Sequence, residues 1–233
     1  MKKILMSWST GKDSAWALHA LSSDPDIEVA GLITTFNAAA DRVAMHAVRR
    51  SLAEAQAARV GLPLWPVELP WPCSNAEYES RMAALIERAV AAGVQAIAFG
   101  DLFLEDIRRY REQQLARTGI EPLFPLWNRP TQGLAREMIA AGLAATVTCV
   151  DPSKLDRSFA GLDFNLEFLD ALPAHVDPCG ENGEFHTFVL DAPFFSDSIR
   201  VERGEILERD GFVFADLVGP LTTAAQRARG PVL

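Results

Sequence analysis

The stretch Met6-Ser7-Trp8-Ser9-Thr10-Gly11-Lys12-Asp13-Ser14 follows an apolar run at residues 4–6 and precedes a segment whose apolar residues recur at helical spacing. A strand, a loop of small residues and a helix, in this order, are typical of an anion-binding turn, because backbone N–H groups can approach the anion at the positive end of the helix. Lys12 adds a full charge, and Ser9 and Ser14 add hydroxyl donors. The stretch therefore predicts a phosphate-binding loop in the first β-α unit of the fold.

This loop differs from two simpler patterns. It lacks the Gly-x-x-x-x-Gly-Lys-Ser/Thr spacing of the common nucleoside-triphosphate loop. A plain strand-to-helix turn capped by Ser and Asp would also fit the position, but capping alone does not require Gly11, Lys12 and two hydroxyls together. Phosphate binding is therefore the preferred hypothesis.

The composition is that of an ordinary soluble globular protein. The 233 residues are 49% hydrophobic and 23% charged, which allows one large domain or two small ones. The net charge of −9 argues against nucleic acid as a partner, because no dense stripe of Lys and Arg is available. The basic cluster Arg108-Arg109-Tyr110-Arg111 fits a solvated helix face or a local anion site.

Cysteine usage and the N-terminus favour a cytoplasmic location. Cys73, Cys149 and Cys179 are far apart and form no Cys-x-x-Cys pair, so we expect neither a disulfide framework nor a zinc finger. The start Met1-Lys2-Lys3 is followed by too few apolar residues for a signal peptide. No segment has the apolar length of a membrane span, so no membrane partner is expected.

The first half of the chain alternates β-type apolar runs with helical periodicity, which predicts parallel β-α-β units. The expected strands are residues 3–7, 29–35, 64–69, 96–100 and 123–127. One expected helix covers residues 41–60, and another begins at the capping box Ser74-Asn75-Ala76-Glu77 and ends at Gly93. Both helices are expected to cover a sheet.

The pattern changes after Trp127. Residues 128–131 indicate a linker into a helix that Gly142 ends, so we expect a first domain at residues 1–128 and a smaller α+β domain at residues 129–233. Within the second domain the sequence predicts a strand at 143–150, a short helix at 165–172, a hairpin of strands 199–203 and 206–209 around Gly204-Glu205, and a strand at 212–218. Residues 221–233 carry little pattern.

Ligands of open parallel sheets bind beyond the carboxyl ends of the strands. The residues that follow the expected strands are 9–14, 34–37 and Gly100-Asp101. Gly100 allows close approach of the backbone, and Asp101 places a carboxylate where it could meet a metal or a ribose hydroxyl. Asp101 could equally be the N-cap of a helix that begins near Phe103, and the residue pattern leaves both interpretations open.

A second polar cluster, Asp177-Pro178-Cys179-Gly180-Glu181-Asn182-Gly183-Glu184-Phe185-His186-Thr187, leads into an expected strand. It could be a Gly/Asn turn with its Glu side chains in water and His186 half-buried. A metal site built from Cys179, Glu184 and His186 lacks a second ligand pair at suitable spacing.

Separate motifs resemble one known family. Residues 9–14 resemble the signature loop, usually Ser-Gly-Gly-Lys-Asp-Ser, of the PP-loop ATP pyrophosphatases, with Thr10 in place of the first glycine. Residues 179–187 are similar to the Gly-Glu-x-Gly-Glu-Phe/Tyr-x-Thr signature of the diphthine ammonia ligase group within that family. The corresponding middle blocks are residues 99–101, Arg108, Arg109 and Arg111, and residues 121–127. The resemblance extends from residue 4 to about residue 194.

The resemblance implies a Rossmann-like (HUP-type) parallel sheet with helices on both faces, in a PP-loop ATP-binding domain over residues 1–128, and an acceptor-binding domain over residues 129–233. It implies an ATP-dependent ligase that uses Mg²⁺. A carboxylate is adenylated, pyrophosphate leaves, and ammonia displaces AMP to form an amide. The sequence leaves open the acceptor, a small molecule or a modified protein side chain such as diphthine, as well as the ammonia source and whether the chain is a homodimer.

The resemblance and the strand ends together give the expected site. ATP is expected to contact Ser7, Ser9, Thr10, Gly11, Lys12, Asp13, Ser14, Thr34, Thr35, Gly100 and Asp101. The expected catalytic residues are Lys12, Asp13, Asp101 and Glu184, with Asp13 and Asp101 as the Mg²⁺ ligands. Glu181, Asn182, Glu184 and His186 are expected to bind the carboxylate substrate or ammonia, with Glu181 or Glu184 as an ammonium site.

Two rival functions share these features. Another PP-loop enzyme that adenylates tRNA bases is disfavoured by the acidic charge and the lack of a Cys-x-x-Cys pair. A non-catalytic adenine-nucleotide sensor would use the same fold without a reaction. Analysis of the products formed from ATP distinguishes these functions.

Overall fold

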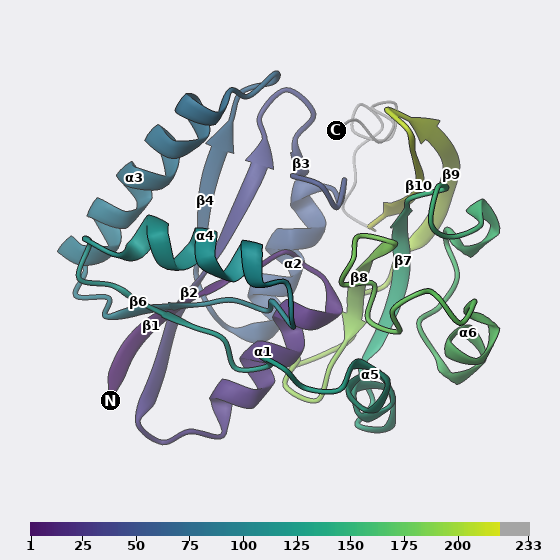
Figure 1. Ribbon diagram of the computed structural model, residues 1–233, viewed down its shortest axis with the longest axis horizontal. Helices are drawn as coiled ribbons and strands as arrows, with labels where there is room; N and C mark the ends of the chain where they lie inside the picture. Colours follow the sequence, from purple (N-terminus) through teal and green to yellow (C-terminus); the bar gives the residue numbers. More distant parts are fainter. Residues whose placement is uncertain (220–233) are drawn as a thin grey trace.

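The computed structural model describes residues 1–219 (Figure 1). The expectation for residues 221–233 lies outside the described residues. In the described part, no helix combines the length and apolar character that crossing a membrane requires.

Sheet A is mostly parallel and has the strand order of a Rossmann-like fold. Its strands are β1 (Lys2–Ser7), β2 (Ile27–Asn37), β3 (Arg42–Val43), β4 (Leu64–Leu69), β5 (Ala96–Ala98) and β6 (Glu121–Leu123). The parallel strands lie in the order β4-β2-β1-β5-β6, and the short β3 pairs antiparallel with the end of β2. The direction of winding reverses between β1 and β5, and such a switch point is where open α/β sheets bind ligands.

Helices cover both faces of sheet A (Figure 1). They are α1 (Lys12–Ser22), α2 (Arg50–Val60), α3 (Asn75–Ala91) and α4 (Glu105–Leu115). Ile4 and Met6 of β1 belong to the same apolar cluster as α1, whereas Leu5 belongs to the cluster that contains α3 residues. This alternation follows from strand geometry, since successive side chains point to opposite faces. The expected Rossmann-like α/β class is confirmed.

Sheet B is antiparallel and lies beside the α1 and α2 side of sheet A (Figure 1). Its strands are β7 (Ala144–Val150), β8 (Phe185–Asp191), β9 (Glu202–Arg209) and β10 (Phe212–Val218), in the order β8-β7-β10-β9. It is accompanied by α5 (Thr131–Ala140), the 3-10 turn η1 (Arg157–Phe159) and α6 (Leu166–Ala171). One apolar cluster runs from β1 and α1 into β7 and β8. The two sheets therefore share a core, and a domain boundary at residue 128 stays a prediction.

The expected helix over residues 41–60 is wrong in its first half, because α2 begins only at Arg50. Three residues of the preceding loop have positive φ: Asp41, Met45 and Ala47. That conformation is incompatible with a right-handed helix. The Nη1 atom of Arg42 donates to the Ala47 carbonyl at 2.7 Å and to Asp216 of β10 at 2.9 Å. These contacts close the loop on itself and attach it to sheet B.

The strand expected at residues 123–127 is displaced to Glu121–Leu123. Residues 125–128 form a turn in which Leu126 is fully buried and the Trp127 ring packs against Phe124. A turn therefore buries Leu126 and leaves Phe124 and Trp127 half-buried, without a strand. The strand expected at residues 96–100 ends at Ala98 and leaves the following residues in a loop.

The expected turn at Gly204-Glu205 is also wrong. Both residues lie within β9, and the hairpin turn is Asp210-Gly211, where φ is 51° and 83°. A two-residue turn with positive φ at both positions matches the twist of the flanking strands. The expected strand over residues 212–218 and the Ser74 capping contact, in which Ser74 accepts from the Glu77 N–H at 3.2 Å, are confirmed.

Candidate functional site

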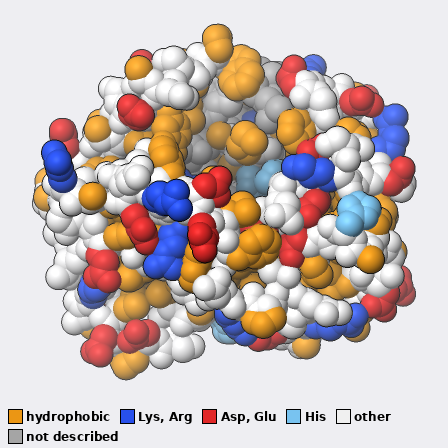
Figure 2. Space-filling model, in the orientation of Figure 1, with side chains coloured by type: hydrophobic (Ala, Val, Ile, Leu, Met, Phe, Trp, Pro, Cys, Tyr) orange, Lys and Arg blue, Asp and Glu red, His pale blue; other side chains and the backbone are white. Residues whose placement is uncertain are grey.

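A cavity of about 390 Å³ opens where the carboxyl ends of β1 and β5 face β8 of sheet B. The surface is visibly hollowed between the two sheets (Figure 2). Among the residues expected to contact ATP, those that line the cavity are Ser7, Ser9, Lys12, Asp13, Ser14, Gly100 and Asp101. Glu181 and His186 line it from the second polar cluster. Two motifs from distant parts of the sequence thus meet at the switch point of sheet A.

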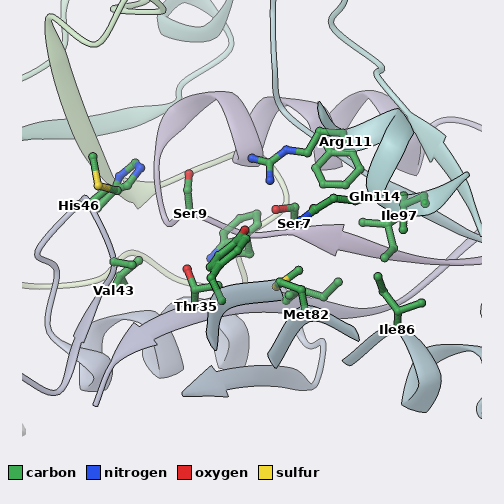
Figure 3. A pocket seen from close by; sticks show the side chains of 17 residues that line it. Ser7, Ser9, Thr35, Val43, His46, Met82, Ile86, Ile97, Arg111 and Gln114 are labelled. Carbon is green, nitrogen blue, oxygen red and sulfur yellow. The ribbon is translucent and has the colours of Figure 1, made fainter. Parts of the chain in front are cut away.

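A second cavity of about 180 Å³ adjoins the first and shares Ser7, Ser9, His46 and Arg111 with it. Figure 3 shows Ser9 and His46 at one end of this cavity and Ile86 and Ile97 at the other. Thr35 lines the second cavity, whereas Thr10, Gly11, Thr34, Asn182 and Glu184 line neither. We call the first the polar cavity, because the charged side chains of Lys12, Asp13, Asp101 and Glu181 line it, whereas the residues around the second, between β1, β2 and α3, are mainly apolar.

The phosphate-binding loop turns into α1 at Gly11, which is the N-cap residue and has no side-chain cap. The Ser14 hydroxyl donates to the Gly11 carbonyl at 2.9 Å and lies 3.2 Å from the Ser9 hydroxyl. A Cβ atom on Gly11 would lie 3.2 Å from the His46 ring and 3.2 Å from the Thr187 carbonyl. The turn is therefore not a plain side-chain-capped turn, and the absence of a side chain at Gly11 is a packing requirement.

Thr10 occupies the position that is usually glycine in the family signature. Its φ is 72°, a left-handed conformation that β-branched residues rarely adopt. The Thr10 carbonyl accepts from Gln56 Nε2 at 3.0 Å and from the Val189 N–H at 3.0 Å, which holds the strained residue between α2 and β8. Its hydroxyl is buried without a hydrogen-bond partner.

We expect the Thr10→Gly substitution to stabilise the protein by about 1 kcal/mol. It relieves the left-handed strain of about 1–2 kcal/mol and removes a buried hydroxyl that has no partner, and these gains outweigh the extra flexibility of glycine in the unfolded chain. The free energy of unfolding in urea measures the effect. A loss of stability would show that the Thr10 side chain contributes packing that exceeds its strain.

Lys12 is buried, and its ammonium group points towards sheet B. The Nζ atom donates to Asp13 Oδ2 at 2.8 Å and to the Cys179 carbonyl, and it lies 5.6 Å and 5.2 Å from the ring centroids of Phe164 and Phe185. Burial is the largest single influence and lowers the pKa of Lys12, but Asp13, together with Cys179 and Glu181, outweighs it, so the pKa is raised above its usual value. Lys12 remains charged and joins the loop to the second motif.

Three carboxyl groups face the cavity: Asp13, Asp101 and Glu181. Burial raises the pKa of each, and for Glu181 the pKa reaches about 7. Glu181 Oε1 accepts the Leu102 N–H at 2.7 Å, which connects the second motif to the loop after β5. Asp101 is not the N-cap of α4, since that position is Leu104.

The carboxylates of Asp13 and Asp101 fit a magnesium ion. Each has one buried oxygen without a hydrogen-bond partner, and their charges interact, since Asp13 raises the pKa of Asp101. No group of three or more His, Cys, Asp or Glu side chains in residues 1–219 is arranged to hold a metal. Mg²⁺ is commonly held by one or two carboxylates together with substrate phosphates and water, so two oxygen ligands are sufficient.

Glu181 predicts a pH dependence of stability. Its pKa in the folded protein, about 7, is raised above its usual value of 4.5, chiefly by burial. Its contribution is therefore present below pH 4.5 and is lost as the pH rises towards 7. We expect the Glu181→Gln variant to gain stability relative to the parent protein between pH 5 and about 7.5, measured by urea unfolding at both values. A constant difference between the two proteins would contradict the raised pKa.

Glu184 and Asn182 line neither cavity: Glu184 is buried, and Asn182 is exposed on the surface. Glu184 is 3% exposed, and its Oε1 accepts from the Asp177 N–H at 3.0 Å and from Asn182 Nδ2 at 3.1 Å. The Asn182 carbonyl accepts from Lys154 Nζ at 2.8 Å. The structure thus brings Glu181 and His186 into the cavity, whereas Glu184 and Asn182 shape the loop that carries them.

Two polar residues that line the cavity, His46 and Arg111, are not among the site residues expected from the sequence. His46 lies on the loop that was expected to be helical, and its ring centroid is 4.6 Å from that of His186. No local signal marks it. Arg111 lies 3.7 Å from Asp101 Oδ2 and packs over the Phe99 ring. Of the two interpretations of the basic cluster at residues 108–111, a solvated helix face or a local anion site, the second is the one that Arg111 in the cavity fits.

Comparison with known proteins gives matches over most of the chain. Residues 1–122 match the family model described as diphthamide synthase N-terminal domain, and residues 130–215 match diphthamide synthase C-terminal domain. A diphthine–ammonia ligase of Rattus norvegicus is 33% identical over 130 residues, covering 52% of this chain and 48% of the rat protein. One of Danio rerio is 36% identical over 120 residues, covering 48% and 46%. The chain thus spans about half the length of these curated relatives.

Proposed function

Because the chain belongs to the diphthamide synthase family, we propose that it is an ATP-dependent amide ligase of the diphthine–ammonia ligase type. One observation carries this proposal, namely that the loop at residues 9–14 and the motif at residues 180–187 line one cavity. A ligase must hold the nucleotide and the acceptor so that they meet, and two motifs around one cavity can do this. A cytoplasmic location remains a prediction.

We assign the phosphate chain of ATP to the polar cavity and the nucleoside to the adjoining one. The N-terminus of α1 and the Ser9 hydroxyl face the polar cavity and can donate to phosphate oxygens. The Ser14 hydroxyl also lines the cavity but donates to the Gly11 carbonyl, so it would have to rotate before it could donate to phosphate. Ile86 and Ile97 give the adjoining cavity the apolar surface that an adenine ring requires. Thr35 stands at the end of β2 in that cavity.

In the proposed reaction an acceptor carboxylate oxygen attacks the α-phosphorus, and the bond between that phosphorus and the bridging oxygen of pyrophosphate breaks. Asp13 and Asp101 would hold Mg²⁺, which neutralises charge on the phosphates when it is bound. Ammonia then attacks the acyl carbon, and AMP leaves as the amide forms. Lys12 already donates to Asp13 and to the Cys179 carbonyl. We therefore propose that it holds the loop in place and adds a positive charge close to the phosphates.

Glu181 is the group best suited to handle ammonia. Ammonium must lose a proton before nitrogen can attack, and the Glu181 carboxyl, whose pKa is about 7, can accept one near neutral pH. It lines the cavity, unlike Glu184. Of the two candidates for the ammonium site, Glu181 and Glu184, we therefore propose Glu181.

We propose that the acceptor is a carboxylate. Diphthine is the first candidate to test, because the relatives are named diphthine–ammonia ligases. The experiment is pyrophosphate exchange into ATP with candidate acids, followed by product analysis with ammonium. AMP and pyrophosphate support the ligase, whereas ADP and phosphate overturn it. Exchange that needs tRNA would indicate a tRNA-modifying enzyme, and ATP that binds without turnover would indicate a sensor.

A further inference from the structure

Two imidazoles lie against each other above the phosphate-binding loop. His46 comes from the loop before α2 and His186 from β8, and their ring centroids are 4.6 Å apart with an interplanar angle of 39°. Both line the polar cavity. The His46 ring lies next to Gly11, since a Cβ atom there would meet Cε1 at 3.2 Å. An anion held at the N-terminus of α1 would therefore be adjacent to this pair.

The conformation of the loop around His46 is unfavourable by itself. Met45 and Ala47, its two neighbours, have φ values of 65° and 53°, a left-handed conformation that is strained for residues other than glycine. The loop is held by the contact between Arg42 and the Ala47 carbonyl. Strain of this kind persists where surrounding contacts fix it, and it is concentrated at functional sites. Its effect here is to direct one imidazole into the cavity.

The cations that line the polar cavity in the described part of the chain already have carboxylate partners. Lys12 donates to Asp13 and the Cys179 carbonyl, and Arg111 lies beside Asp101. By contrast, His46 Nδ1 is buried and has no hydrogen-bond partner. A phosphate chain carries several negative charges and favours protonation of nearby groups. Protonation of Glu181, which lines the same cavity, would only remove a negative charge, whereas protonation of an imidazole would add a positive charge beside the phosphate.

We propose that the His46–His186 pair is a proton-accepting anion site: one imidazole takes up a proton from solvent when a phosphate chain occupies the loop. The resulting imidazolium donates to the phosphate and neutralises charge on the leaving pyrophosphate. The proton returns to solvent when pyrophosphate departs. This inference rests on the proposed function, to which it adds how the leaving group is stabilised.

The electrostatic surroundings are consistent with this switch. Burial lowers the pKa of His46 well below its usual range, and His186 and Lys12 lower it further, while the Thr187 backbone opposes the shift. Burial, Lys12 and Lys154 lower the pKa of His186 to about 4. Both imidazoles are therefore neutral at pH 7 without ligand. A bound anion reverses the sign of the field from the positive side chains and so favours the protonated form.

The test uses the full chain labelled with ¹⁵N at histidine and inorganic pyrophosphate, with and without magnesium, as the probe. Long-range ¹H–¹⁵N spectra at pH 7 report the protonation of each imidazole. We expect one signal of the His46–His186 pair to become imidazolium on saturation, while His19 and His175, which line neither cavity, serve as internal references. Pyrophosphate that binds while both imidazoles stay neutral overturns the inference but leaves the proposed function standing.

Variants provide a second measurement. An imidazole that is charged at pH 7 in the complex must have a pKa above 7 there. We therefore expect His46→Gln and His186→Gln to weaken pyrophosphate binding at pH 6 by about tenfold or more and to change it little at pH 9. A purely structural role would weaken binding equally at both pH values and would overturn the inference. No pyrophosphate or ATP binding by the parent protein at any concentration would overturn both this inference and the proposed function.

Discussion

Replacement of Gly100 by Ala is expected to reduce ATP affinity by about a hundredfold and to destabilise the fold by about 2 kcal/mol. A Cβ atom at this position would lie 2.9 Å from the carbonyl carbon of Asp13 and 2.9 Å from the backbone N of Ser14. These are backbone atoms in the first turn of α1, so no side chain can rotate away. The turn proposed to hold the phosphates, together with the Asp13 carboxylate, must move instead.

Calorimetric titration with a non-hydrolysable ATP analogue and urea unfolding measure the two effects. Gly133→Ala is the matched control, because Gly133 lies within α5 and has nothing within 4 Å of the new Cβ atom. That variant should bind ATP normally and gain about 1 kcal/mol from the higher helix propensity of Ala. Normal ATP affinity in Gly100→Ala would refute the close contact between the loop after β5 and α1 as a requirement of binding.

The Asp216→Asn substitution is expected to destabilise the protein by about 3 kcal/mol or more. Asp216 is 7% exposed, and its carboxylate accepts from Arg42 Nη1 at 2.9 Å and from Arg49 Nε at 3.1 Å. Burying the two guanidinium groups costs free energy, and their attraction to the Asp216 carboxylate offsets much of that cost. Asparagine has no negative charge, so this attraction is lost. The loop that carries His46 loses an anchor in sheet B, so we also expect weaker pyrophosphate binding.

Urea unfolding at pH 7 measures the stability change, and Asp170→Asn is its control. Asp170 accepts from Arg136 at 2.7 Å, but both side chains are exposed, and exposed ion pairs contribute less than about 1 kcal/mol. If both variants lost the same small amount of stability, the buried ion-pair cluster would not be what joins the two sheets.

Local pattern was sufficient for several elements. β4 and β10 have the predicted bounds, and the Ser74 capping contact forms as predicted. In each case the signal comes from neighbours in sequence: β-branched and apolar runs, or a Ser three residues before a Glu. The Asp210-Gly211 turn carried an equally local signal that was overlooked in favour of Gly204-Glu205.

Other features depend on partners that are distant in the sequence. The loop that contains His46 has helical apolar spacing, yet the contact of Arg42 with Asp216 prevents a helix there. Glu184 belongs to a functional-looking motif, but its Oε1 accepts from a backbone N–H within the same loop. The periodicity of the local sequence predicts neither the loop around His46 nor the hydrogen bonding of Glu184, because both depend on burial and on pairing with other parts of the fold.

The class of fold and the two polar motifs, at residues 9–14 and 179–187, could be identified from local sequence, because small residues, charge and apolar periodicity act over a few neighbouring positions. Which polar side chains reach the cavity depends on the packing of distant segments: Glu181, His186 and His46 do, and Glu184 does not. The physical reason is that a side chain's direction and charge state depend on what the rest of the chain packs against it.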